Sequence, residues 1–394
     1  MSIANHFRYG CPTVRSIGLL AVLFSVGFAP CSALGQPAPG GGYIVDPVDV
    51  TQLQNKSKVS AILRKGTFGA GEQDMFDKYY ETYALARWSD PKTRHLLTTF
   101  RRDLDRDLRT AKRGSAYNHL RDLILTRFTT TASQNYHRAV RVNAMLMIGE
   151  LNEAEPAKLA ENPVPHAAAL QTVLLPAIQA ATQPDAVKVA AMAGIARHAR
   201  LGAPMPPSVQ TEMITLVTSE TAPGPSADGR AWMRVQAARV LGAMGSLGTD
   251  GVVPNAIARM VADEPLRLAA RCAAARALGE LKYGGAGWRS AGVTVLSLRQ
   301  LALDACDAEK DGVLRRRLAS HLSSISTGLG GNPNDPTENG IGPLAGSGSG
   351  PQFVAGLTAS LGALEALLID ESLDDLTLTE RVGQEADKIR ALAP

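Results

Sequence analysis

The chain has 394 residues, a net charge of +4 and an apolar fraction of 45%. This length allows a sizeable core, and many alanines with only 5% aromatic residues suit packed helices better than a sheet protein. We find no GxGxxG, Walker A or nucleophile-elbow pattern, which disfavours nucleotide-dependent and acyl-transfer enzymes. Nucleic-acid binding would need basic residues interleaved with exposed aromatic ones along one groove, and it is disfavoured because a protein with the export signal described next rarely meets DNA.

Residues 1–35 predict an export signal. Arg8 and Arg15 supply a basic start, an apolar stretch follows from Ile17 to Phe28, and small residues suggest cleavage near 33–36. The stretch is shorter than the roughly 20 apolar residues of a transmembrane helix. The sequence therefore predicts an exported protein, periplasmic or extracellular, with no membrane span in the mature chain.

Of the next two segments, the first is expected to be flexible and the second helical. Residues 36–60 begin with Pro and Gly and are predicted to be a flexible leader. Residues 61–135 are predicted to be an N-terminal helical cap or divergent repeats, because apolar residues recur there at helical spacing. The expected helices are Asp74–Trp88, Lys92–Thr110 and Tyr117–Thr129. In the charged run 101–109 we expect Arg101–Asp105 and Asp105–Arg109 pairs on a solvated helix face.

A short segment then recurs through residues 136–327. Three clear copies occupy 141–149, 234–242 and 271–279, each starting with a basic residue and carrying small residues at its centre. Weaker copies start at Lys188 and Arg315. The fourth positions are Ala144, Ala191, Ala237, Ala274 and Leu318. Their separations of 47, 46, 37 and 44 residues are close to the roughly 40–47 of two-helix repeats.

Each copy is predicted to be the second helix of a pair. The first helices are expected at about 167–182, 208–219, 252–262 and 291–306. Pro176 lies inside the earliest of them and is expected to kink it, because proline removes a donor and crowds the preceding turn. One such pair cannot bury its own apolar face, so the pairs are expected to stack.

The residues of these pairs resemble the HEAT repeat. The pattern is carried by Leu174-Leu175-Pro176, Asp185, Val187-Lys188 and Ala190-Ala191, and by the later Ala pairs followed by Leu241-Gly242 and Leu278-Gly279. The resemblance implies an all-α fold, an α-solenoid of stacked HEAT-like helix pairs with helical caps at both ends. It says little about function.

The basic residue that opens each copy has two interpretations. Arg141, Lys188, Arg234, Arg271 and Arg315 occur once per unit. A structural interpretation is favoured, in which they pair with turn acids such as Asp185, Asp228 or Asp263 and form a ladder through the stack. Better candidates for partner binding are positions off the apolar face of the second helices. They are Asn143, Gln236, Arg239, Arg276 and Arg317.

No metal or cofactor site is predicted. The seven histidines lack an i, i+4 pair, and the cysteines lack metal-ligand spacing. Without the signal, Cys272 and Cys306 remain. A disulfide is possible in an exported protein, but two buried thiols in places that suit alanine are favoured.

The chain is expected to end in a loop and two helices. Residues 328–351 are rich in Gly, Asn, Pro and Ser and are predicted to be a mobile loop. Residues 352–394 are predicted to cap the last unit with helices at Phe353–Ile369 and Thr379–Leu392. Residues 56–143 hold 18 basic and 9 acidic residues, whereas residues from Leu361 onward hold 8 acidic and 3 basic ones. Opposite charges at the two ends would allow head-to-tail assembly.

The sequence thus favours a non-catalytic scaffold that binds a protein partner through an extended surface. Two alternatives remain. The chain could be a structural cell-envelope protein that assembles end to end. It could also be similar to the phycobilin lyases, HEAT-like proteins that hold a tetrapyrrole, although the export signal counts against that resemblance.

Overall fold

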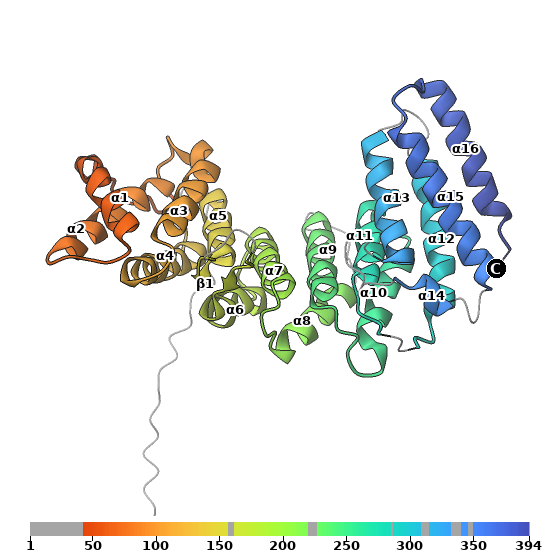
Figure 1. The fold of residues 1–394 in the computed structure, drawn as a ribbon, viewed down its shortest axis with the longest axis horizontal. Coiled ribbons are helices and arrows are strands. Elements are labelled where there is room, and N and C mark those ends of the chain that lie inside the picture. The colour runs from red at the N-terminus through yellow and green to blue at the C-terminus, as the bar shows by residue number, and fades with distance from the viewer. Residues whose placement is uncertain are drawn as a thin grey trace, which may run out of the picture.

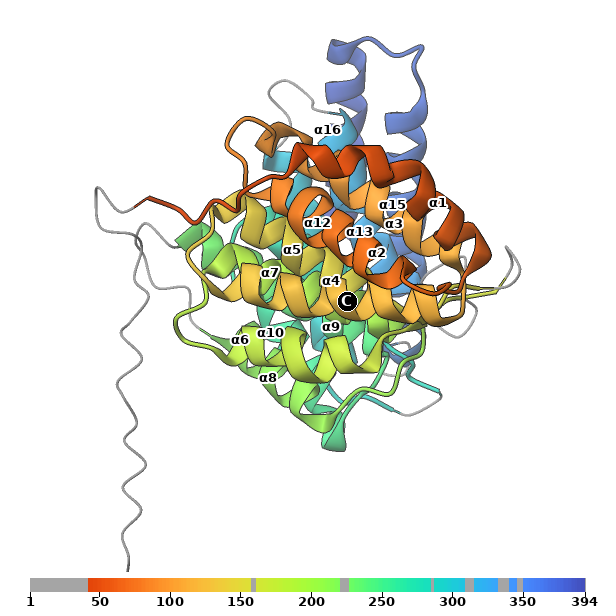
Figure 2. The same ribbon diagram turned by 90° about the vertical axis from the view of Figure 1, so that its left-hand side faces the viewer.

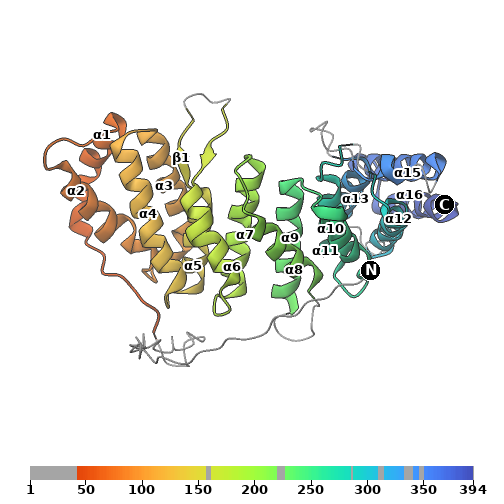
Figure 3. The ribbon, with the colours of Figure 1, turned by 90° about the horizontal axis from the view of Figure 1, so that it is seen from below.

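The computed structural model describes residues 42–156, 161–219, 227–284, 287–308, 315–331, 340–345 and 350–393. These residues form an all-α fold with 16 α-helices and one small pair of strands. The helices follow one another in an elongated array from α1 at one end to α16 at the other (Figures 1 and 3). The predicted export signal lies outside the described residues.

Four helices open the array, with short 3-10 and π segments between them. The bounds are η1 Val50–Asn55, α1 Lys56–Lys65, α2 Glu72–Tyr79, η2 Tyr80–Ala84, η3 Ala86–Trp88, η4 Arg94–Leu96, α3 Leu97–Ala111 and α4 Ser115–Ser133. Their core is aromatic, with Phe76, Tyr80, Tyr117, Trp88 and Phe128 all almost fully buried. Trp88 and Phe128 pack with ring centroids 4.4 Å apart. This end therefore has bulky side chains where the rest of the chain uses alanine.

The predicted leader is bound to these helices. The Ile44 amide donates to the carbonyl of Asn135, and the Asp46 carboxylate contacts Arg127 at 2.5 Å and accepts from the Tyr136 hydroxyl at 3.0 Å. Helical structure begins at Val50. The expectation of a flexible leader up to residue 60 is therefore wrong from Ile44 on, because Asp46 is held by partners about 80 to 90 residues away.

The middle of the array alternates between two layers of helices. One layer holds α5 Arg138–Glu150, α7 Asp185–Arg200, α9 Ala227–Met244, α11 Leu268–Gly279 and α13 Arg315–Gly330. We call it the inner row; each helix packs on the next. The other layer holds η5 Ala169–Leu174 with α6 Leu175–Gln179, α8 Pro207–Thr218, η6 Thr249–Gly251 with α10 Val252–Ala262, and α12 Ala291–Ala308. Figures 1 and 2 show α6, α8 and α10 together on one side of the array.

These bounds confirm the expected positions of the first helices. Pro176 lies in the first turn of α6, directly after the π-helical segment Ala169–Leu174. The helix is therefore π-helical just before the proline, whereas the expected feature was a kink. A small antiparallel pair, β1 Asn152–Ala154 and β2 Val164–Pro165, separates α5 from η5. The sequence analysis did not foresee it.

Small residues let the inner-row helices approach closely. A Cβ built on Gly149 of α5 would lie 2.6 Å from the Cα of Gly194 on α7, closer than real Cβ atoms come to other carbons. Gly242 of α9 meets Ala277 of α11 in the same way, at 3.1 Å. A Cβ on Gly279 would overlap the backbone of α13. The contacts join corresponding halves of successive helices, so the inner-row helices run parallel.

The repeated arginines connect one helix pair to the next. Arg234 Nε donates to the carbonyl of Val217 at the end of α8, while its Nη1 lies 2.7 Å from Asp263 at the end of α10. Arg271 repeats the arrangement with the carbonyl of Val261 and with Asp304, the latter at 2.8 Å. Both guanidinium groups are buried, which favours the structural interpretation of these residues over ligand contact.

Two further arginines of the repeat also link neighbouring segments, but they donate to different acceptors. Arg141 donates to the carbonyl of Ala132 and to the amide oxygen of Gln183, the latter at 2.9 Å. Arg315 donates to the carbonyls of Asp370 and Leu373 beyond α15. The expected partners Asp185 and Asp228 were not the right ones. Asp228 contacts Arg267, and Lys188 forms no ion pair with any described residue.

Helices α14 Gly342–Ala345, α15 Pro351–Ile369 and α16 Asp375–Ala391 complete the array. The predicted loop 328–351 is wrong at both its start and its centre, since α13 continues to Gly330, and Ile341 and Ala345 of the α14 region are buried. Residues 332–339 and 346–349 lie outside the description. Helix α15 is long and apolar enough to cross a membrane by length and composition, with a third of that stretch buried against its neighbours. Cys272 and Cys306 are free and buried, as favoured.

Candidate partner-binding surface

Helix α9 exposes a large aromatic side chain in the middle of the inner row. Trp232 is 52% exposed, whereas Trp88 and Trp288 are buried. The helix is covered by α7 on one side, α11 on the other and α8 beneath. Only a narrow strip that includes Asp228, Trp232 and Arg239 is left open to solvent.

Arg239 lies beside this tryptophan, and two more arginines lie near Arg239. The Arg239 guanidinium carbon lies 5.7 Å from the centre of the Trp232 ring, within the range of a cation–π contact. Partial burial, with Arg200 of α7 and Arg276 of α11 nearby, lowers the pKa of Arg239 from its ordinary value. Three inner-row helices therefore bring positive charge to one place. We call Trp232, Arg200, Arg239 and Arg276 the Trp232 patch.

Glu280 fixes one edge of the Trp232 patch. Its carboxylate accepts from Arg276 Nε at 3.0 Å, one helical turn away on α11. The same carboxylate reaches across to α9, where a Cβ built on Gly242 would lie 2.8 Å from Glu280 Oε2. Glycine at 242 thus leaves room for an acid that orients Arg276. With one acid against three arginines, the patch has a surplus of two positive charges.

The structure brings together two of the five predicted binding residues. Arg239 and Arg276 are exposed and lie in the Trp232 patch. Arg317 is exposed in the first turn of α13, whereas Arg276 is in the last turn of α11. Because these neighbouring helices are parallel, Arg317 and Arg276 lie at opposite helix ends, on opposite edges of the inner row.

The other two predicted residues are occupied or covered. Asn143 is half-buried, accepts from Arg101 Nη1 at 3.3 Å and donates to the Ala139 carbonyl at 2.9 Å. Gln236 is 7% exposed, so placing it on a binding surface was wrong. Gln236 is covered because helices pack on three sides of α9. The positions of apolar residues along one helix do not show how many neighbours that helix has. Trp232 was missed, although its spacing of seven residues from Arg239 places both on one helix face.

A charged hollow of about 660 Å³ lies where α3, α5, α7 and the strand pair meet. It is lined chiefly by arginines and carboxylates of equal number: Arg101, Arg102, Arg109, Arg197, Asp105, Glu150, Glu155 and Glu161. Arg101 contacts Glu150 at 3.5 Å, so the expected Arg101–Asp105 pair was wrong, while the Asp105–Arg109 pair is confirmed at 3.0 Å. Equal numbers of both charges give no preference for an ion of either sign.

The floor of this hollow is a buried polar network. Glu155 Oε1 accepts from Asn152 Nδ2 at 2.8 Å, and the Tyr117 hydroxyl donates to the Asn152 carbonyl at 2.9 Å. Arg197 completes it with a 2.6 Å bond to Asn152 Oδ1. Burial and the nearby Glu155 raise the pKa of Tyr117, so its hydroxyl remains a donor. The network holds the strand pair against α4 and α7, a structural role.

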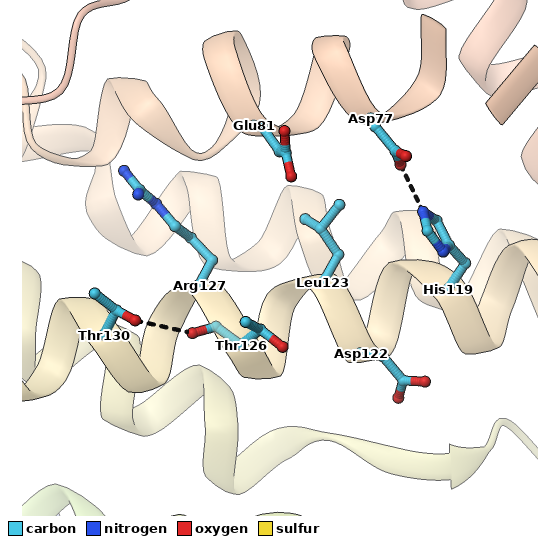
Figure 4. A pocket seen from close by; sticks show the side chains of 8 residues that line it. All are labelled: Asp77, Glu81, His119, Asp122, Leu123, Thr126, Arg127 and Thr130. Atoms are coloured by element: carbon cyan, nitrogen blue, oxygen red, sulfur yellow. Dashed lines mark hydrogen bonds and ion pairs between the residues drawn. The ribbon is translucent and has the colours of Figure 1, made fainter. Parts of the chain in front are cut away.

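A second hollow, of about 630 Å³, lies between α2 and α4 (Figure 4). Figure 4 shows His119 and Asp77 pointing toward one another across it, with ring nitrogen and carboxylate oxygen 2.5 Å apart. Arg127 on the same rim contacts Asp46. Three of the ionic groups that line this hollow, His119, Asp77 and Arg127, are thus already paired. Within the described ranges, no cluster of three or more His, Cys, Asp or Glu could hold a metal ion.

Comparisons of this chain with protein-family models, with curated proteins and with solved structures find no match.

Proposed function

We propose that this chain is an exported, non-catalytic scaffold that binds a protein partner through the Trp232 patch. In this proposal the helix pairs form an α-solenoid of HEAT-like repeats, and the inner row presents the binding side chains. The proposal is supported by the repeat spacing in the sequence and by the parallel inner row with its arginine links. Export rests on the pattern of residues 1–35.

One observation carries the binding role. Trp232 is half-exposed and contacts Arg239, and Arg239 has an arginine of each neighbouring inner-row helix nearby. Tryptophan and arginine are the residue types most enriched among those that dominate binding energy at protein interfaces. A rigid row that holds them in fixed positions limits the entropy lost on binding. The arrangement fits a protein partner better than a small molecule, because the patch is an open surface.

The test is affinity capture from an extract of the source cell envelope. The purified protein is the bait, beside variants Trp232→Ala and Arg239→Glu. The matched control is Arg259→Glu, which makes the same charge change at an exposed position of α10 in the other layer. The proposal expects a stoichiometric protein that the wild type and the control retain and that both patch variants lose. Capture that is equal for all four baits, or no capture at all, would contradict it.

A separate measurement tests export. Cell fractionation followed by N-terminal sequencing of the purified protein should give a mature end near residues 33–36. An intact N-terminus in the cytoplasmic fraction would contradict export without affecting the binding surface.

A further inference from the structure

A second exposed apolar feature lies at the far end of the array. Ile369 is 76% exposed and Leu376 is 83% exposed, the two highest values among the large apolar side chains described. They flank the turn that joins α15 to α16, which projects from the array in Figures 1 and 2. We call residues 369–376 the acidic tip.

The acidic tip is strongly negative. Four acidic residues and no basic residue occur from Ile369 to Leu376, and one of the four, Asp375, contacts Arg315 of α13 at 3.7 Å. Asp370 accepts from the amide and hydroxyl of Ser372, and Asp374 accepts from the amide of Thr377. These bonds lower the pKa values of both carboxyls, so they remain charged in mildly acidic solution. They also fix the shape of the turn, and Glu371 is left exposed beside the two aliphatic side chains.

The acidic tip and the Trp232 patch are complementary. One has aliphatic side chains bordered by carboxylates, and the other has an aromatic ring in contact with one guanidinium group, which has two more nearby. Each leaves apolar surface in water that docking on the other would cover. Arg–carboxylate contacts at the border would give the contact its orientation.

We propose that the acidic tip of one copy docks on the Trp232 patch of a second copy. The inference rests on the proposed function, whose binding surface it uses, and it names the partner as this chain itself. Within one copy the tip lies at the end of the α15–α16 hairpin, away from α9 in both side views (Figures 1 and 2). The two surfaces are different, so a copy whose tip is docked still has its patch free, and a copy whose patch is occupied still has its tip free. Such a contact builds open chains of copies.

The first experiment is sedimentation equilibrium of the purified protein from low micromolar to several hundred micromolar. Average mass should rise steadily with concentration, without stopping at a dimer. Salt near 1 M should weaken the association at least ~10-fold, since the Debye length falls to about 3 Å. Arg239→Glu, Glu371→Arg and Leu376→Ser should each weaken it by ~10-fold or more, and Arg259→Glu should not. A mass that stays monomeric throughout would overturn the proposal.

The second experiment mixes two defective variants. Arg239→Glu has no working patch but an intact tip, and Glu371→Arg has the opposite defect. Together they should form a 1:1 complex that does not grow, because only one productive contact per pair is possible. If the mixture behaves as two independent monomers, the tip does not dock on the patch.

The two proposals can fail separately. A protein that stays monomeric but captures a foreign partner through Trp232 would end the self-docking inference and leave the proposed function intact. Assembly that is lost in the tip and patch variants, with no foreign partner captured, would support self-docking and replace the scaffold role by an end-to-end structural one. Assembly that is unchanged in Arg239→Glu, Glu371→Arg and Leu376→Ser would contradict self-docking.

Discussion

Arg234 and Asp263 form an ion pair, with Nη1 2.7 Å from Oδ2, that links α9 to the end of the next outer helix, α10. The arginine side chain is 6% exposed and also donates to the Val217 carbonyl, whereas the aspartate is 30% exposed. The buried arginine belongs to one helix pair and the aspartate to the next. This ion pair therefore stabilises the contact between the two helix pairs.

Replacement of Arg234 by Ala should lower the free energy of unfolding by about 2–4 kcal/mol. The loss combines a buried charged hydrogen bond, an ion pair and the packing of a long side chain. Thermal and urea unfolding followed by circular dichroism would measure it. The control is Arg276→Ala on the exposed face, which should change the free energy by less than about 1 kcal/mol. Equal effects of the two variants would show that the buried link does not couple neighbouring units.

Glycine substitutions should have opposite effects on stability in the inner row and on the surface. Gly279→Ala should destabilise strongly, because the new Cβ would overlap the backbone of Thr327 on α13. Gly362→Ala on α15 has no atom within 4 Å of the new Cβ and should stabilise by roughly 0.5–1 kcal/mol through helix propensity. The melting temperatures of the two variants should therefore move in opposite directions. A similar shift of both would contradict the close approach of α11 and α13.

His198 should make stability depend on pH. It is fully buried, neither ring nitrogen has a described hydrogen-bond partner, and burial with nearby Arg197 and His166 lowers its pKa to about 4. The folded protein then holds the ring neutral, whereas the unfolded chain takes up a proton below about pH 6.5. Stability is therefore complete above pH 6.5 and decreases as the pH falls to about 4, by up to about 3 kcal/mol.

The check is a series of unfolding curves between pH 8 and pH 4 for the wild type and His198→Leu. The variant should keep most of its stability at pH 8, since no described hydrogen bond is lost, and should show a shallower decline toward pH 4. Parallel curves for the two proteins would mean that His198 finds a polar partner in solution.

Cys272 and Cys306 should resist alkylation in the native protein. Burial raises the pKa of Cys272 to about 12 and that of Cys306 to about 11, so the thiolates needed for reaction are scarce. Brief exposure to iodoacetamide at pH 8, followed by peptide mass spectrometry, should label both thiols only after unfolding. Rapid labelling of either one in native buffer would show that its helix opens locally.

The helices were more predictable than the surface. Apolar spacing and proline placement located α8, α10 and α12 within one or two residues, because these signals act along the chain. Arg239 and Arg276 were found from helical phase alone. Gln236 was misplaced by the same reasoning, because its burial depends on how many helices surround α9. Asp46 and Ile44 were assigned to a leader because their partners are distant in the sequence.

The links between helix pairs are unequal, and this has a mechanical consequence. Arginine joins the units at α5, α9, α11 and α13, whereas α7 has Lys188 at the corresponding place, with no such link among the described residues. A force applied along the array should then open the joint between α7 and α9 first, because no buried arginine link of this kind joins those two helix pairs among the described residues. Single-molecule extension should show a first yielding step there, and Lys188→Arg with Thr218→Asp should shift that step to higher force if the missing guanidinium link is its cause.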